Sequence, residues 1–169
     1  MPLIIMVMGL PGSGKSFFSK RLADTLGATY IGSDELRGKK GLKGNYGMAS
    51  KQQVYDAMIK AAEEMVQHHG DTVLDATFFL QETRNQVREL AKKYKVKLIP
   101  ILVEAEENII GKRLSKPRTD SEADYQVYRK IKESFEPIKG PYLSLLSTNE
   151  NIDEMLKKAV HYLGNQDGK

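Results

Sequence analysis

A short glycine-rich segment near the start of the chain constrains its fold more than any other feature. Residues 9–16 read GLPGSGKS and match the Walker A pattern G-x-x-x-x-G-K-[ST] in full. The apolar run 3–8 before this segment is typical of a buried parallel strand, and the stretch 16–26 after it predicts a helix. A chance match in a glycine-rich turn would lack this context. The segment therefore predicts a phosphate-binding loop (P-loop).

The residue types of this loop suit the binding of ATP and Mg²⁺. Glycines let the backbone curl so that successive N–H groups point at phosphate oxygens. The helix that begins near Lys15 adds the positive end of its dipole. We expect Lys15 to reach the β- and γ-phosphates and the Ser16 hydroxyl to ligate Mg²⁺. The expected nucleotide-binding residues of the loop are Gly9, Gly12, Ser13, Gly14, Lys15 and Ser16.

The rest of the chain alternates apolar runs with amphipathic stretches. After the first strand, apolar runs predict strands at 29–31, 73–75, 97–103 and 142–146. Helical spacing predicts helices at 16–26, 50–69, 82–94, 108–114, 122–135 and 152–163, and the Gly- and Lys-rich segment 37–47 reads as a loop. This alternation indicates helices on both faces of a parallel sheet. We expect a three-layer α/β P-loop NTPase fold of the kinase type, with a five-stranded parallel sheet and a helical lid.

Size and composition favour a single globular domain. The 169 residues, 40% hydrophobic and 28% charged, fit a single globular domain over 1–169. The absence of cysteine excludes a disulfide scaffold, a thiolate nucleophile and a Cys-ligated zinc, and it fits a reducing cytoplasm. No run approaches about 18 apolar residues, so we expect a cytoplasmic protein without a membrane partner. A net charge of +4 permits polyanion binding but does not establish it.

The second expected strand leads into Asp34 and Arg37. Ligands of parallel sheets sit outside the carboxyl ends of the strands, so Asp34 should lie near the phosphates. A carboxylate there can accept the proton of an attacking hydroxyl, and Arg37 can hold an anionic acceptor group from the same cleft. The alternative is that Asp34 only caps the following helix.

The third expected strand ends in Asp75. Apolar residues followed by a carboxylate are typical of a Walker B position, where the carboxylate holds Mg²⁺ or its waters. Strand-terminal aspartates are common, but this one follows a P-loop strand. We therefore expect Asp75 to support the metal together with Ser16.

Basic residues follow the fourth expected strand, in a segment of about 109–137 that reads as a lid. Arg113 and Arg118 could close over ATP and neutralise charge on the transferred phosphoryl group, with Arg118 favoured because it lies in the irregular part. The alternative is a solvated basic loop. Arg84 could also contact phosphate, although a place on a helix surface is expected for it.

Together these features resemble the small P-loop kinases, a group that includes polynucleotide 5′-kinases, zeta toxins and related predicted kinases. The resemblance rests on the loop 9–16, the pair Asp34-x-x-Arg37, the strand end 74–77 and the arginine-containing segment that runs to Pro137. It covers most of the chain. The P-loop is highly specific, the Asp-x-x-Arg pair is moderately so, and the lid matches loosely.

The resemblance also implies roles for individual residues. In the polynucleotide kinases of this group, the matching aspartate activates the acceptor hydroxyl and the matching arginine contacts the neighbouring phosphate. These roles fall on Asp34 and Arg37 here. A lid arginine that contacts the donor phosphates corresponds to Arg118 or Arg113.

The loop after Arg37 bears on the identity of the acceptor. Lys39, Lys40 and Lys43, with Tyr46 after them, would offer phosphate contacts and one stacking surface to a nucleic acid single strand. The alternative is a solvated loop. We expect transfer of the γ-phosphate of ATP to a 5′-hydroxyl end of RNA or DNA. The second candidate is a small-molecule kinase for a sugar, nucleoside, antibiotic or nucleotide-sugar hydroxyl, and a non-catalytic nucleotide-binding module comes third. The absence of an [NT]-K-x-D motif argues against a GTPase.

Overall fold

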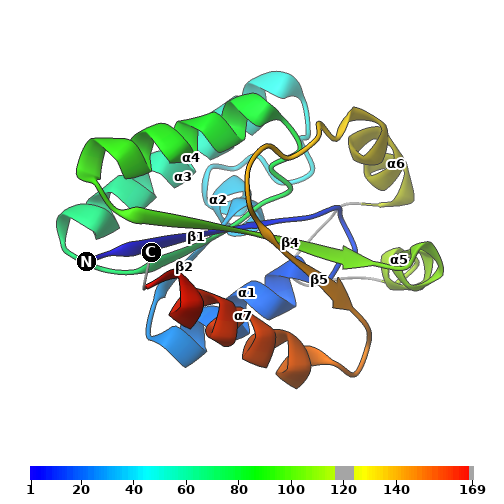
Figure 1. Cartoon of the computed structure of the whole chain (residues 1–169). Coiled ribbons are helices and arrows are strands. Elements are labelled where there is room, and N and C mark those ends of the chain that lie inside the picture. The colour runs from blue at the N-terminus through cyan, green and yellow to red at the C-terminus, as the bar shows by residue number, and fades with distance from the viewer. Residues whose placement is uncertain (117–123, 168–169) are drawn as a thin grey trace.

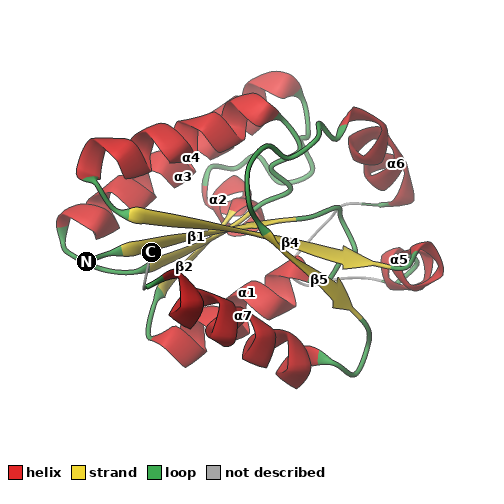
Figure 2. Cartoon of the chain, viewed as in Figure 1, coloured by secondary structure: helices red, strands yellow, loops and turns green. Residues whose placement is uncertain are grey.

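The computed structural model describes residues 1–116 and 124–167, in which five strands alternate with seven helices (Figures 1 and 2). The strands are β1 (Leu3–Met8), β2 (Thr29–Gly32), β3 (Thr72–Asp75), β4 (Lys97–Ala105) and β5 (Leu143–Ser147). The helices are α1 (Lys15–Leu26), α2 (Ser33–Lys39), α3 (Met48–Gln67), α4 (Gln81–Tyr94), α5 (Glu107–Leu114), α6 (Tyr125–Ser134) and α7 (Ile152–Gln166).

The strands form one parallel sheet in the order β2-β3-β1-β4-β5. β1 lies at the centre, between β3 and β4. The chain therefore crosses over β1 when it passes from β3 to β4. All strands point the same way, so their carboxyl ends meet at one edge of the sheet. The P-loop leaves β1 at this edge, the place where parallel sheets usually bind ligands. Figure 1 shows α5 and α6 beyond the same edge.

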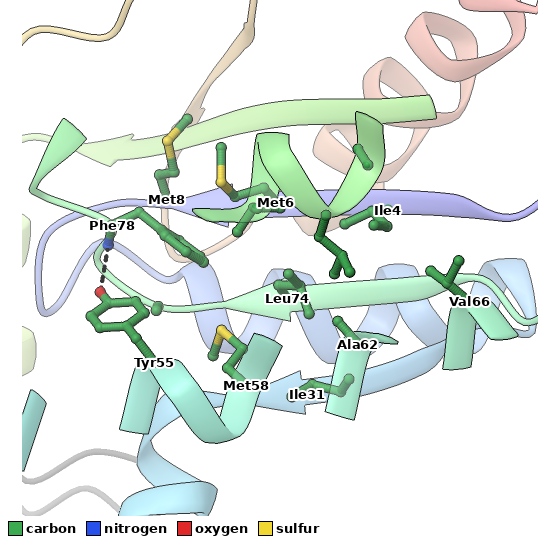
Figure 3. Close-up of a cluster of buried hydrophobic side chains, with 14 residues drawn as sticks. Ile4, Met6, Met8, Ile31, Tyr55, Met58, Ala62, Val66, Leu74 and Phe78 are labelled. Carbon is green, nitrogen blue, oxygen red and sulfur yellow. Dashed lines mark hydrogen bonds between the residues drawn. The ribbon is translucent and has the colours of Figure 1, made fainter. Parts of the chain in front are cut away.

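Alternate side chains of β1 build two separate cores. Ile4, Met6 and Met8 pack under α3 and α4 on one face (Figure 3), whereas Ile5 and Val7 face α1 and α7 on the other. All five side chains are fully buried, which is why the strand reads as a continuous apolar run. Burial of each contributes about 1.5–3 kcal/mol, so the central strand is held firmly from both sides.

The structure confirms the three-layer α/β fold with five parallel strands that the sequence predicts. One expected loop is partly helical, because residues 33–39 form α2 and only the part after Lys40 is irregular. The segment has acidic residues in its first turn and Arg37 and Lys39 in its last, a charge order that suits the helix dipole. Leu36 also packs against the core, which favours a helix over a solvated loop.

Two further expectations concern membranes and the lid. Among the helices of the described residues, none combines the length and apolar character that a membrane span requires. The expected lid of about 109–137 overlaps α5 and α6. Residues 117–123 between these helices, including Arg118, lie outside the described residues.

Candidate active site

The P-loop curls tightly between the end of β1 and the start of α1. Gly14 has φ 90°, a left-handed conformation that side chains disfavour, and a Cβ there would lie 2.7 Å from the Ser147 hydroxyl. A Cβ on Gly9 would lie 2.5 Å from the Val103 carbonyl oxygen. Glycine is therefore required at both positions by the close approach of the neighbouring strands. α1 begins at Lys15, and Lys15 is only 8% exposed.

A cavity of about 500 Å³ lies on one side of Lys15. We name it the Arg113 pocket, and it is lined by the P-loop, α5 and the connection from β5 to α7, with Gly14, Lys15, Arg113, Asn149 and Met155 among its residues. Its volume lies within the range of small-molecule sites. The positive end of α1 and the backbone N–H groups of the loop favour an anion at its inner end.

Arg113 ties three parts of this pocket together. Its Nη1 donates to the Gly12 carbonyl oxygen at 3.0 Å, and its Nη2 donates to Ser147 Oγ and Asn149 Oδ1, each at 3.2 Å. The structure thus brings Arg113 next to the P-loop, where the sequence places a nucleotide contact. Ser147 and Asn149 follow a strand end and carry no motif that sequence reasoning could have used.

Asp75 ends β3 beside β1, and its carboxylate is 3% exposed. Its Oδ2 accepts a hydrogen bond of 2.6 Å from the Tyr30 hydroxyl, and within the described part of the chain its buried Oδ1 has no hydrogen-bond partner. A buried carboxylate oxygen without a partner fits a role in holding Mg²⁺ or its waters. Mg²⁺ commonly binds one or two carboxylates plus substrate phosphates, so this donor set with Ser16 suits it.

Tyr30 is a site residue that the sequence does not reveal, because a tyrosine in a short strand is ordinary. Burial, then the charge of Asp75 and the hydrogen bond to it, raise the pKa of Tyr30, and an interaction with the Ser16 side chain acts in the opposite direction. The hydroxyl therefore keeps its proton and acts as the donor to Asp75.

Asp34 and Arg37 both lie on α2 and form an ion pair. Arg37 Nη1 donates to Asp34 Oδ1 at 3.1 Å, and its guanidinium lies 4.6 Å from the centre of the Tyr46 ring. Arg37 is only 7% exposed. The N-cap of α2 is Gly32, so Asp34 lies inside the first turn and does not act as the cap.

These two residues line a second cavity, of about 40 Å³, which we name the Arg37 pocket. Its lining includes Lys15, Asp34, Arg37, Lys51, Phe79 and Ile131, from the P-loop, α2, α3, the segment after β3, and α6. Lys15 therefore lines both cavities. Lys51 Nζ lies 4.8 Å from the centre of the Phe79 ring, and burial, then Arg37 and Lys130, lower the pKa of Lys51.

The segment after β3 is held by two buried polar side chains. The Phe78 N–H donates to the Tyr55 hydroxyl at 3.1 Å, as Figure 3 shows, and the Phe78 carbonyl accepts from Arg84 Nε at 2.7 Å. Phe78 has φ 48°, an uncommon conformation for a bulky residue that these bonds stabilise. Burial raises the pKa of Tyr55 above its ordinary value.

Arg84 corrects a sequence expectation, because it does not lie on a helix surface. It is fully buried, and its Nη2 and Nη1 donate to the carbonyl oxygens of Glu136 and Pro137 at 2.7 and 3.0 Å. With its bond to Phe78, Arg84 joins the segment after β3 to the chain that follows α6. A contact to phosphate is excluded because its donors are engaged by backbone carbonyls inside the protein.

Comparison with known proteins places this geometry among nucleotide-binding folds. Residues 4–138 match the family described as the AAA domain. No curated protein sequence gives a significant match. Similar solved structures include the APS kinase CysC of Mycobacterium tuberculosis, in complex with AMPPNP and APS, at 19% identity and a TM-score of 0.73 over 96% of this chain and 98% of that one.

Two other solved structures have the same fold. A gluconokinase from Sinorhizobium meliloti 1021 shares 20% identity, with a TM-score of 0.68 over 98% of this chain and 93% of that one. Kti12 of Chaetomium thermophilum, in complex with ADP-AlF3, shares 16% identity, with a TM-score of 0.71 over 94% and 97%. At these identities the likeness is one of fold. Because the family match spans most of the sequence and the fold is that of small P-loop kinases, the chain belongs to the AAA domain family.

Proposed function

We propose that the protein transfers the γ-phosphate of ATP to a hydroxyl group of a small anionic acceptor. The observation that carries this proposal is the position of Lys15, which lines the Arg113 pocket on one side and the Arg37 pocket, with Asp34, on the other. A phosphoryl group held at Lys15 would face a carboxylate across the boundary of the two pockets. A site that only senses nucleotides does not need the second pocket.

On the donor side, the P-loop N–H groups and Lys15 would bind the β- and γ-phosphates of ATP. The nucleoside would extend into the Arg113 pocket, beside Arg113 and Asn149. Ser16 and Asp75 would hold Mg²⁺, which when bound reduces the negative charge of the phosphates. Arg118, which lies outside the described residues, remains a predicted contact to the donor phosphates.

On the acceptor side, Asp34 would accept the proton of the acceptor hydroxyl. The hydroxyl oxygen bonds to the γ-phosphorus, the bond from that phosphorus to the β–γ bridging oxygen breaks, and ADP leaves with that electron pair. Arg37 pairs with Asp34 at 3.1 Å and so orients the carboxylate. Phosphoryl transfer depends mainly on such positioning and on charge stabilisation.

The charge of the Arg37 pocket supports an anionic acceptor. Three cationic side chains, Lys15, Arg37 and Lys51, line it together with one carboxylate, that of Asp34. Among the described residues, no salt bridge engages Lys51, and its ammonium group faces the ring of Phe79 instead. Arginine and lysine in this arrangement suit a phosphate, sulfate or carboxylate group. The aromatic walls would pack against the body of the acceptor.

A 5′-hydroxyl end of RNA or DNA is the second candidate, supported by Lys39, Lys40 and Lys43. All three are exposed beyond Arg37 and could contact the phosphates of a strand. Val127 and Ile131 of α6 line the other side of the Arg37 pocket, which has a volume of about 40 Å³. This volume is well below that of ordinary small-molecule sites, so it does not distinguish the two candidates; a small acceptor is supported instead by the similar solved structures, which include an APS kinase in complex with APS and a gluconokinase.

The test is transfer of label from γ-labelled ATP to a panel of acceptors. The panel contains 5′-hydroxyl RNA and DNA oligonucleotides, nucleoside monophosphates, sugar phosphates and sugar acids. We expect label in a small anionic acceptor with the wild type and with Asp153→Ala, a control at an exposed aspartate on α7, but none with Asp34→Ala. Label only in oligonucleotides would establish the second candidate. ATP binding without transfer to any acceptor would indicate a non-catalytic nucleotide-binding module.

A further inference from the structure

Tyr30 links the two residues that the proposed function assigns to the metal. It lies on β2 two residues before Gly32, so both residues face the same side of the sheet. Gly32 is the register partner of Asp75 on β3. This register brings the Tyr30 hydroxyl to the Asp75 carboxylate, where it donates to Oδ2 at 2.6 Å.

The same hydroxyl also interacts with the Ser16 side chain at the start of α1. The Tyr30 hydroxyl thus donates to the strand-terminal carboxylate and is also influenced by the last residue of the P-loop. Among the described residues, Asp75 Oδ1 keeps no hydrogen-bond partner although it is buried. The tyrosine therefore bonds one carboxylate oxygen, and the other is the oxygen without a partner.

Gly32 provides the space that this arrangement needs. Its φ and ψ of −111° and 140° are extended values that any residue can adopt, so backbone conformation does not require glycine. A Cβ on Gly32 would collide with the Tyr30 hydroxyl. The missing side chain is explained by the position of the tyrosine, which indicates a fitted contact between β2 and Asp75.

We propose that Tyr30 is a positioning residue of the magnesium site: its hydroxyl holds Asp75 by Oδ2 beside Ser16, so that Oδ1 is presented to the hydrated ion. Outer groups that orient metal-holding carboxylates affect metal affinity by about 10–100-fold when they are removed. The proposal rests on the proposed binding of Mg²⁺ and ATP but not on the identity of the acceptor. A purely structural role for Tyr30 would alter stability alone.

The test is Tyr30→Phe, which removes one oxygen and keeps the ring. Binding of Mn²⁺ to the ATP-bound protein is measured by electron paramagnetic resonance, and ATP binding is measured separately in EDTA. We expect the Mn²⁺ dissociation constant to rise about tenfold, while ATP affinity in EDTA stays within about twofold. The P-loop N–H groups and Lys15 remain intact in this variant, so metal-free binding should not change.

The chain offers a matched control in Tyr94. Its hydroxyl donates to the carboxylate of Glu63 at 2.7 Å, the same chemistry at a place outside both pockets. Tyr94→Phe should leave Mn²⁺ affinity unchanged. Gly32→Ala should weaken Mn²⁺ binding in the same direction as Tyr30→Phe, because the added carbon displaces the hydroxyl.

A double variant shows whether Tyr30 acts through Asp75. Asp75→Asn should weaken Mn²⁺ binding, and the addition of Tyr30→Phe should weaken it no further. Unchanged Mn²⁺ affinity in Tyr30→Phe, with only a lower melting temperature, would overturn the proposal. Absence of transfer to every acceptor would refute the kinase function, yet it would leave the Mn²⁺ result interpretable.

Discussion

The two pockets that meet at Lys15 are built in different ways. The Arg113 pocket, of about 500 Å³, combines the P-loop with residues of α5, the connection from β5 to α7, and α7 itself. The Arg37 pocket, of about 40 Å³, takes its walls from α2, α3, the segment after β3, and α6. The phosphate-binding end of the first pocket is a local backbone motif, whereas the second pocket is assembled mainly from side chains of separate elements.

Polar groups also differ between the two pockets. The Arg113 guanidinium donates hydrogen bonds to Gly12, Ser147 and Asn149, and it thereby holds the P-loop to the segment after β5. In the Arg37 pocket, Arg37 is paired with the Asp34 carboxylate at 3.1 Å, whereas Lys51 lies over the Phe79 ring and has no salt bridge among the described residues. Aromatic faces stabilise cations less than an anionic ligand in the same place would. Lys51 therefore retains a capacity to bind an anion on the acceptor side that its own contacts do not use.

The largest effect is expected where the two pockets meet, at Lys15. Lys15→Ala removes the cation that would hold the transferred phosphoryl group, and kcat/KM should fall at least about a thousandfold. Transfer from γ-labelled ATP to the best acceptor measures it. Lys157→Ala, at an exposed lysine on α7, serves as the control. Near-normal transfer by Lys15→Ala would refute a mechanism in which Lys15 holds the transferred phosphoryl group between the two pockets.

The difference between the pockets explains how much of the fold could be predicted from the sequence. The strand 3–8 is apolar throughout because both of its faces are covered, and this pattern is readable without a structure. Residues 37–47 read as a loop from their composition, which does not reveal that Leu36 packs against the core and that the helix it belongs to continues to Lys39. Arg84 was expected on a surface for a similar reason. Its burial depends on carbonyls at Phe78 and Glu136, the second of which is more than 50 residues away in the chain.

Candidate site residues follow the same rule. Gly14 and Lys15 belong to a local motif that the sequence shows directly, and both line the Arg113 pocket. Lys51 and Phe79 enter the site only through the packing of α3 and of the segment after β3. Tyr30 reaches Asp75 through the register of two strands, which spacing along the chain does not determine.

The second largest effect is on stability. It tests whether the segment after β3, which lines the Arg37 pocket, can be destabilised without a change in ATP affinity. Arg84→Met keeps the length of the side chain but leaves the carbonyls of Phe78, Glu136 and Pro137 without their donor. The free energy of unfolding should fall by about 3 kcal/mol, measured by urea denaturation. Hydrogen exchange should increase in the segment after β3, while ATP affinity changes little.

A neighbouring arginine on α4 provides the control for this variant. Arg88 is exposed to a greater extent and donates to the Lys139 carbonyl at 2.7 Å, so Arg88→Met should cost less than about 1 kcal/mol. Equal losses of stability in the two variants would contradict the role of Arg84. A large loss of ATP affinity in Arg84→Met would show that the two pockets are not separable.

The third effect should be confined to the donor side. Arg113→Lys keeps a positive charge but cannot reproduce a planar group that bonds Gly12, Ser147 and Asn149 together. ATP affinity, measured by calorimetry, should weaken about tenfold, which corresponds to about 1.4 kcal/mol. The KM of the acceptor should stay the same. Lys112→Ala on the exposed side of α5 should leave ATP affinity unchanged, and a matching loss there would point to a general effect of charge.

The smallest effect is a dependence of acceptor binding on pH, and it is specific to the other pocket. Burial, followed by Arg37 and Lys130, lowers the pKa of Lys51, so this side chain loses its proton at a lower pH than an exposed lysine. Only the protonated form attracts an anion. The KM of the acceptor should therefore rise, by about fivefold, as the pH increases from neutral towards about 10.

Lys51→Arg separates this effect from the titration of other groups near the site. Arginine stays charged throughout the same range, so the KM of the acceptor should become nearly independent of pH in this variant. Lys51→Met should give the high KM of the deprotonated wild type at every pH. The charged neighbours on α2 and α6, Arg37 and Lys130, are unchanged in both variants. If the wild type and Lys51→Arg show the same pH profile, Lys51 does not bind the acceptor, and the anion is held by Arg37 and Lys15 alone.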